Sequence, residues 1–148
     1  MPTWLIFALG TVCCWGAYGT AIHKSNALLA NPLKTALLVG VAYFFLAVLI
    51  PSLIMKSSGA DWSFPGKGMM FGLLAGSLGA IGAICVIYSM KSGGNPQYVM
   101  PIIFGCAPLV NVIVSSVAHP PKAVNPIFWL GVLVLASGAG MVLYFQPK

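Results

Sequence analysis

The sequence predicts an all-α membrane protein, a bundle of five transmembrane helices that forms one domain over residues 1–148. Hydrophobic residues make up 59% of the chain and charged residues 5%, whereas about 25% of a soluble protein is charged. Five apolar segments each reach the roughly 20 residues that a helix needs to cross a bilayer. The linkers between these segments are short and carry nearly all the charge, so we expect no soluble domain.

Each predicted span begins near a proline. The expected spans cover residues of about 4–22, 33–55, 67–90, 97–117 and 126–146. The second, fourth and fifth spans follow the pairs Asn31-Pro32, Asn95-Pro96 and Asn125-Pro126, and the first and third follow looser signals at Pro2 and Pro65. An Asn side chain can accept a hydrogen bond from an unpaired N–H of the first turn, while proline at the first helical position loses only an N–H without a partner. These pairs therefore predict helix starts.

The third span carries small residues at helical spacing, among them Gly72, Gly76 and Gly79. In lipid no hydrophobic effect drives helices together, and small residues allow two helix backbones to approach closely. We therefore expect these glycines to pack against neighbouring helices. The alternative is that the row reflects only the general glycine content of membrane helices.

The fourth span contains two prolines away from its start. A proline inside a helix removes one backbone hydrogen bond and presses on the carbonyl one turn earlier. In lipid, the freed carbonyl must be buried in protein or face a wet cavity. We expect a helix bend at Pro101, Gly105 and Pro108. Spacings of three and four residues place on one helix face Pro101, Gly105 or Phe104, Pro108, Asn111 or Val112, and Ser115.

Aromatic residues of the other spans are candidates for lining the same cavity. The expected substrate-binding residues are Trp15, Tyr18, Tyr43, Tyr88, Asn111 and Ser115. Aromatic rings with a few placed donors and acceptors suit a small, mostly neutral ligand. An amide in hydrocarbon must find partners and is often functional or an interhelical link. The alternative is that Trp15 and Tyr18 only fill the bundle core while the prolines shape it.

The sequence lacks the residues, or the spacing of residues, that several kinds of chemistry need. No predicted span contains Asp, Glu or Arg, so we expect no obligatory proton relay. The four cysteines have no metal-like spacing to the two histidines, and no nucleophile–base–acid set appears. We therefore expect no metal, no cofactor and no enzymatic activity. The seven lysines are scattered and arginine is absent, which makes nucleic-acid binding a poor interpretation.

With these motifs, the chain resembles the drug/metabolite transporter superfamily, in particular one EamA-like repeat. The resemblance rests on CWGAYGT, GAICVIYSMKSGGNPQYVMPI, FGCAPLVNVIVS and LGVLVLASGAGMVLY. Tyr88, Lys91 and Pro108 match places where that family typically has an aromatic residue, a lysine and a proline. The usual acidic residue before the last span is absent, and Val12 stands where the small multidrug branch keeps a glutamate. The resemblance thus implies a transporter of neutral metabolites, such as sugars or amino acids, rather than proton-coupled multidrug export.

The resemblance also implies a half-transporter. Ten-helix members of the family look like two five-helix repeats in opposite orientation that enclose a site. A chain with one repeat is expected to work as a homodimer by alternating access, with an antiparallel dimer as one arrangement. One side of the membrane would carry Lys56, Lys67 and Lys122, and the other Lys24, Lys34, Lys91 and Lys148. Three against four gives almost no bias of lysine toward one side, as insertion in both orientations would require.

The expected location is the cell (inner or plasma) membrane, with the bilayer, a small-molecule substrate and a second copy as partners. The first span lacks the basic start and cleavage pattern of a signal peptide, so we expect it to remain as a membrane helix. The alternative function is a non-transporting membrane subunit or scaffold whose glycine rows bind a partner membrane protein.

Overall fold

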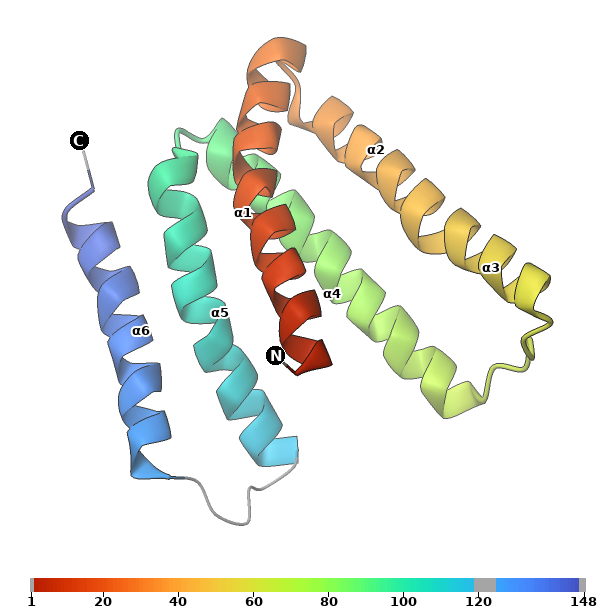
Figure 1. The fold of residues 1–148 in the computed structure, drawn as a ribbon. Helices are drawn as coiled ribbons and strands as arrows, with labels where there is room; N and C mark the ends of the chain where they lie inside the picture. Colours follow the sequence, from red (N-terminus) through yellow and green to blue (C-terminus); the bar gives the residue numbers. More distant parts are fainter. Residues whose placement is uncertain (1, 119–124, 147–148) are drawn as a thin grey trace. The chain divides into compact units, whose positions relative to one another are not determined.

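The computed structural model describes residues 2–118 and 125–146. In this part of the chain the ordered elements are all helical: α1 (Thr3–Leu29), α2 (Pro32–Tyr43), η1 (Phe44–Leu49), α3 (Ile50–Ser58), α4 (Gly66–Lys91), α5 (Pro96–Ala118) and α6 (Pro126–Tyr144) (Figure 1). Since α2, η1 and α3 form one continuous run, the described residues contain five helices long and apolar enough to cross a membrane. The prediction of an all-helical, multi-pass membrane protein is confirmed at this level.

The helix starts follow from their caps. The side-chain oxygens of Asn31, Asn95 and Asn125 each accept a hydrogen bond, at 2.9 Å, from the backbone N–H two residues later. A proline stands at the first helical position after each of them. Each cap satisfies one N–H that the helix itself leaves unpaired. The Asn-Pro pairs therefore mark the starts of α2, α5 and α6, as predicted.

The first helix is longer than its apolar segment. The predicted span ended near residue 22, but α1 continues to Leu29. The extension carries the polar stretch His23 to Asn26, whose hydropathy resembles that of a linker. As a result, Asn26 lies on a helix rather than in a loop.

Two helices end on residues in the left-handed conformation. Ala30 follows α1 with φ 54°, and its N–H bonds to the Asn26 carbonyl at 3.0 Å. Gly59 follows α3 with φ 64°, and its N–H bonds to the Lys56 carbonyl. Glycine adopts this conformation without steric cost, whereas the Cβ of alanine approaches the neighbouring carbonyl oxygen.

Exchanging the two residue types at these helix ends is expected to give effects of opposite sign. Ala30→Gly should raise the free energy of unfolding by about 1 kcal/mol, and Gly59→Ala should lower it by about the same amount, because only glycine avoids the steric cost at positive φ. Thermal unfolding of the purified protein in detergent measures both changes. A shift in the same direction for both variants would contradict the conformations described here.

The second span contains a π-helix that was not predicted. In η1 the helix widens, and the N–H of Ile50 bonds to the Phe45 carbonyl, five residues earlier. Pro51 follows at once; it has no N–H, and its ring presses on the carbonyl one turn earlier. The wider turn accommodates this interruption, and π-helical turns are frequent at functional sites. The predicted span 33–55 included Pro51 without any change of helix type.

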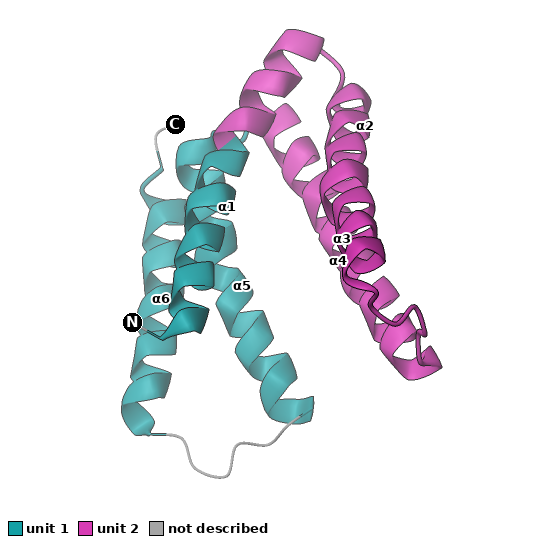
Figure 2. Cartoon of the chain, turned by 45° about the vertical axis from the view of Figure 1, so that its right-hand side comes forward, with its two compact units in different colours: residues 1–19, 94–148 teal, residues 20–93 magenta. Residues whose placement is uncertain are grey.

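The chain divides into two compact units (Figure 2). Unit 1 takes its described residues from 1–19 and 94–148 and contains the first part of α1 with α5 and α6. Unit 2 covers residues 20–93 and contains the last part of α1, the α2–η1–α3 run and α4. In unit 1, α5 lies alongside α6, and in unit 2, α2 packs against α4. The expectation of one transmembrane domain stays a prediction.

Candidate functional site

α5 carries the two internal prolines and runs through both of them, from Pro96 to Ala118, as a continuous helix. Pro101 and Pro108 lack the N–H groups that would bond the carbonyls of Gln97 and Phe104, four residues earlier in each case. Both carbonyls therefore lose their regular helical donor. In a membrane span, such carbonyls must be buried in protein or face water. α5 thus supplies two backbone acceptors for which the helix itself provides no donor.

One face of α5 packs closely against α6. A Cβ built at Gly105 would lie 2.7 Å from the Cβ of Ala139 and 3.4 Å from the Leu135 carbonyl oxygen. The first distance is shorter than real Cβ contacts, so only glycine permits this approach of the two helices. Ala139 is buried by the contact. Gly105 therefore faces α6; its expected part in a helix bend stays a prediction.

A second face of α5 points toward an aromatic side chain of α1. The rings of Phe104 and Trp15 stack with centroids 6.1 Å apart and planes 15° apart, and both residues belong to unit 1. Helical spacing of four, three and four residues continues the face of Phe104 through Pro108, Asn111 and Ser115. We call these four residues the α5 face. Of the two alternatives left open by the sequence, Phe104 belongs to it and Gly105 does not.

The polar members of the α5 face are accessible. Asn111 and Ser115 are exposed, and Trp15 is 56% exposed. Among the described residues, the Asn111 side chain has no hydrogen-bond partner. An amide without a partner is costly in hydrocarbon, so it requires water, a ligand or another chain. Asn111 is therefore the residue on this face that needs a partner, whether water, a ligand or another chain.

The three tyrosines predicted for the site fall in different units. Tyr18 lies half-buried on the unit 1 part of α1. Tyr43, 46% exposed, directly precedes η1, and Tyr88, 43% exposed, lies on α4; both belong to unit 2. Within unit 1, the structure joins Trp15 to the α5 face. The participation of Tyr43 and Tyr88 in the same site stays a prediction.

The predicted packing glycines of α4 have no close neighbour in their own unit. Beyond the adjacent turns of α4, no described atom of unit 2 lies within 4 Å of a Cβ built at Gly72, Gly76 or Gly79. Unit 2 therefore leaves this row of small residues uncovered. Their predicted role in helix packing would have to involve a helix from outside unit 2.

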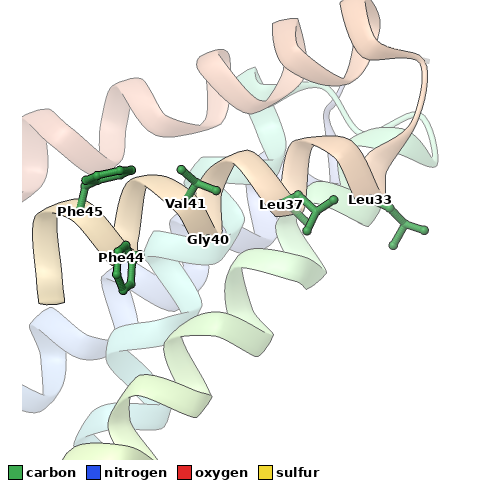
Figure 3. A pocket seen from close by; sticks show the side chains of 7 residues that line it. Leu33, Leu37, Gly40, Val41, Phe44 and Phe45 are labelled. Carbon is green, nitrogen blue, oxygen red and sulfur yellow. The ribbon is translucent and has the colours of Figure 1, made fainter. Parts of the chain in front are cut away.

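A hollow of about 740 Å³ lies along α2 and η1, around Gly40 (Figure 3). Figure 3 shows apolar side chains on both sides of this glycine. The lining consists of Leu33, Ala36, Leu37, Gly40, Val41, Phe44 and Phe45. All of these come from one continuous helical run, and none has a polar side chain. The hollow is thus an apolar surface of one helix, and it contains no residue of the predicted site.

The one acidic residue lies outside the spans. Asp61 is in the linker between α3 and α4, where the hydroxyl of Ser63 and, at 3.0 Å, the N–H of Ser63 donate to its carboxylate. The hydroxyl bond is the main cause that lowers the pKa of Asp61 below its ordinary value, followed by the N–H bond. Among the described residues, no three His, Cys, Asp or Glu side chains form a metal-binding group.

No protein-family model, no curated protein and no solved structure matches this chain. The helices alone therefore define the class to which it belongs. Five apolar helices of membrane-crossing length make it a multi-pass membrane protein.

Proposed function

We propose that this chain is an integral membrane transporter of small, mostly neutral metabolites in the cell membrane, and that it is an EamA-like half-transporter. The observation that carries the proposal is Asn111. Its amide is exposed and has no partner among the described residues, and it lies in an apolar span on the same face as Pro108 and Phe104. On a lipid-facing surface such an amide would remain unpaired in hydrocarbon, whereas in a substrate pathway it can form hydrogen bonds with water or with the solute.

The α5 face offers matched chemistry for a neutral solute. The rings of Trp15 and Phe104 present apolar surface, and the Asn111 amide both donates and accepts hydrogen bonds. The Phe104 carbonyl, released by Pro108, adds an acceptor. Asn111 stands seven residues from Phe104, or about 10 Å along the helix, so one small solute can reach both. On entering the span, the hydroxyl or amide groups of a solute would replace their hydrogen bonds to water by hydrogen bonds to the Asn111 amide and the Phe104 carbonyl.

The proposal includes a homodimer with alternating access. A single five-helix chain supplies one α5 face, and a second copy would close the path from the other side. The uncovered row Gly72, Gly76 and Gly79 on α4 supports contact with a helix of another copy. The near-equal lysine numbers on the two sides of the membrane support copies of opposite orientation.

No enzymatic step, metal or cofactor forms part of the proposal. The side chains of the α5 face bind and orient, and none of them is a nucleophile paired with a base. The bend about Pro101 and Pro108 would let the two ends of α5 move against each other, so that the face opens to one side of the membrane at a time.

The second candidate function is a membrane subunit without transport activity. The same uncovered glycine row on α4 favours it, because small residues also suit the binding of a different membrane protein. In that case, the chain would depend on a neighbouring polypeptide for its stability.

Solute flux into proteoliposomes tests the proposal. The purified chain is reconstituted and mixed with iso-osmolar solutions of sugars or amino acids, and light scattering follows the swelling of the vesicles. We expect saturable swelling with a subset of the solutes, above that of protein-free vesicles. A lack of flux, together with co-purification of an unrelated membrane protein in fixed ratio, would favour the subunit function.

A further inference from the structure

We infer that unit 2 binds a single water molecule at a buried polar cluster formed by Ser25 and Asn26 of α1 and Thr35 of α2. We call these three residues the Asn26 cluster. The inference concerns a structural site in unit 2 and does not depend on transport.

The Asn26 cluster lies among the best-buried residues of unit 2. Asn26 is 6% exposed and Thr35 is 1% exposed. The surrounding apolar residues are equally enclosed, with Ile22 on α1 at 2% and Ile87 on α4 at 0%. A polar atom at this place does not reach bulk solvent, and the hydrocarbon of a membrane contains no water that could form a hydrogen bond with it. Its partners must therefore lie inside the unit.

The Asn26 amide is only half satisfied. Its Nδ2 donates to the Ile87 carbonyl at 2.9 Å and so ties α1 to α4. Its Oδ1 is buried and has no hydrogen-bond partner among the described residues. An amide oxygen can accept two hydrogen bonds, and the great majority of buried polar atoms make at least one. Asn26 Oδ1 can therefore accept a hydrogen bond from a donor outside the described residues.

The neighbouring hydroxyl groups hold an unused donor. Ser25 Oγ and Thr35 Oγ1 lie 3.1 Å apart and form one hydrogen bond between α1 and α2. Among the described residues this bond uses only one of the two hydroxyl protons. Either hydroxyl of the pair can keep the unused proton, and Ser25 is the residue directly before Asn26, so the hydroxyl pair with its unused donor adjoins the unused acceptor. Water can accept from the first and donate to the second.

Charge and size exclude the other small ligands. Lys24 and Lys34 directly precede Ser25 and Thr35 in the sequence, and their positive potential opposes a metal cation. An anion would repel the lone pairs of the unpaired Oδ1. A larger solute would have to displace the residues that bury Asn26 and Thr35. A neutral donor of the size of water meets all three conditions.

The bound water gives the last part of α1 a defined attachment. The Nδ2 bond joins α1 to α4, the hydroxyl pair joins α1 to α2, and the water connects these two links into one network. Buried waters typically make about three hydrogen bonds and are costly to remove. The C-terminal part of α1 is thereby held to both helices of unit 2 by polar contacts in addition to its apolar packing.

A density map of the wild-type protein in detergent or nanodiscs, at a resolution that shows ordered water, tests the site directly. We expect a peak within about 3 Å of Asn26 Oδ1 and of one hydroxyl of the Ser25–Thr35 pair. The inference is overturned if Oδ1 accepts instead from a protein donor, such as a lysine ammonium group, or if apolar side chains fill the space beside it.

A mutant cycle measures the coupling that the water creates. The three variants are Asn26→Leu, Ser25→Ala combined with Thr35→Val, and the triple substitution; Ser77→Ala, at an exposed serine of α4, serves as the control for loss of a hydroxyl. Either partial removal should lower Tm by about 2–4 °C, and the triple variant should lose clearly less than the sum, because either change alone already releases the water. Additive losses, or a rise of Tm in Asn26→Leu, would overturn the inference.

Discussion

Replacing Asn111 with leucine is expected to lower solute flux roughly 100-fold, close to the level of protein-free vesicles, while expression, folding and dimerisation stay unchanged. The reason is the loss of the polar side chain on the α5 face: a solute that enters the apolar span without it leaves its own donor or acceptor unpaired, which costs about 1–3 kcal/mol for each group. Initial rates of swelling or of labelled solute uptake measure the change.

The same helix offers a control for this substitution. Ile113 is 63% exposed on α5 and stands two residues after Asn111, about 200° around the helix and so away from the α5 face. Ile113→Leu should therefore leave the flux within about twofold of the wild type. Size-exclusion chromatography of both variants checks that they fold and dimerise alike. Undiminished flux through the Asn111→Leu protein would remove Asn111 from the transport site.

Replacing Gly105 with valine is expected to lower the free energy of unfolding by about 3 kcal/mol. Even the Cβ alone would come within 2.7 Å of the Ala139 Cβ, so the helices α5 and α6 must move apart and lose their close contact. Thermal unfolding in detergent measures the loss.

Two further variants show whether the close contact causes this effect. Gly131 lies on α6, where an added Cβ meets no described atom within 4 Å, and Gly131→Val should change the stability by less than about 0.5 kcal/mol. Removing the Ala139 methyl should offset the milder change at Gly105, so the pair Gly105→Ala and Ala139→Gly should be more stable than Gly105→Ala alone. Equal losses in Gly105→Val and Gly131→Val would contradict the packing described for α5 and α6.

Hydropathy and capping signals were sufficient to predict that five spans exist and where most of them begin. The Asn-Pro pairs mark the starts of α2, α5 and α6, because a cap depends only on the residues beside it. The end of α1 could not be read in the same way. His23 to Asn26 are polar, and a helix that extends beyond its apolar segment gives no hydropathy signal. The spacing Ile22, Asn26, Leu29, which continues a helical face, was the available sign.

The candidate site was predictable as a helix face but not as a set of contacts. Phe104 and Gly105 are consecutive residues, about 100° apart around α5, and spacing alone allows either of them beside Pro108. The neighbouring helices decide: Gly105 meets Ala139 of α6, and Phe104 stacks on Trp15 of α1. Such tertiary contacts cannot be derived from the periodicity of one helix.

The buried cluster and the π-helix were missed for similar reasons. Asn26 and Thr35 are polar residues near predicted span ends, where exposure to solvent is the ordinary expectation, and only the packing of three helix segments buries them. For η1, the sequence did contain a signal, since Pro51 interrupts the backbone bonding of an apolar span. The sequence does not determine whether the helix accommodates Pro51 by a kink or by a wider, π-helical turn.

Sided labelling at the two ends of α4 tests whether copies of opposite orientation build one transport path. Ser63 and Ser92 are exposed serines that flank α4, so Ser63→Cys and Ser92→Cys report opposite sides of the membrane. Each is introduced alone into a background without the four native cysteines, Cys13, Cys14, Cys85 and Cys106. An impermeant thiol reagent is applied to intact cells and then to lysed cells.

We expect about half of the copies to be labelled from outside at each of the two positions, because a dimer of opposite orientations presents both ends of α4 on both sides. Complete labelling at one position and none at the other would contradict this arrangement. The second half of the path would then have to be a different protein, and the function as a membrane subunit would replace the homodimeric transporter.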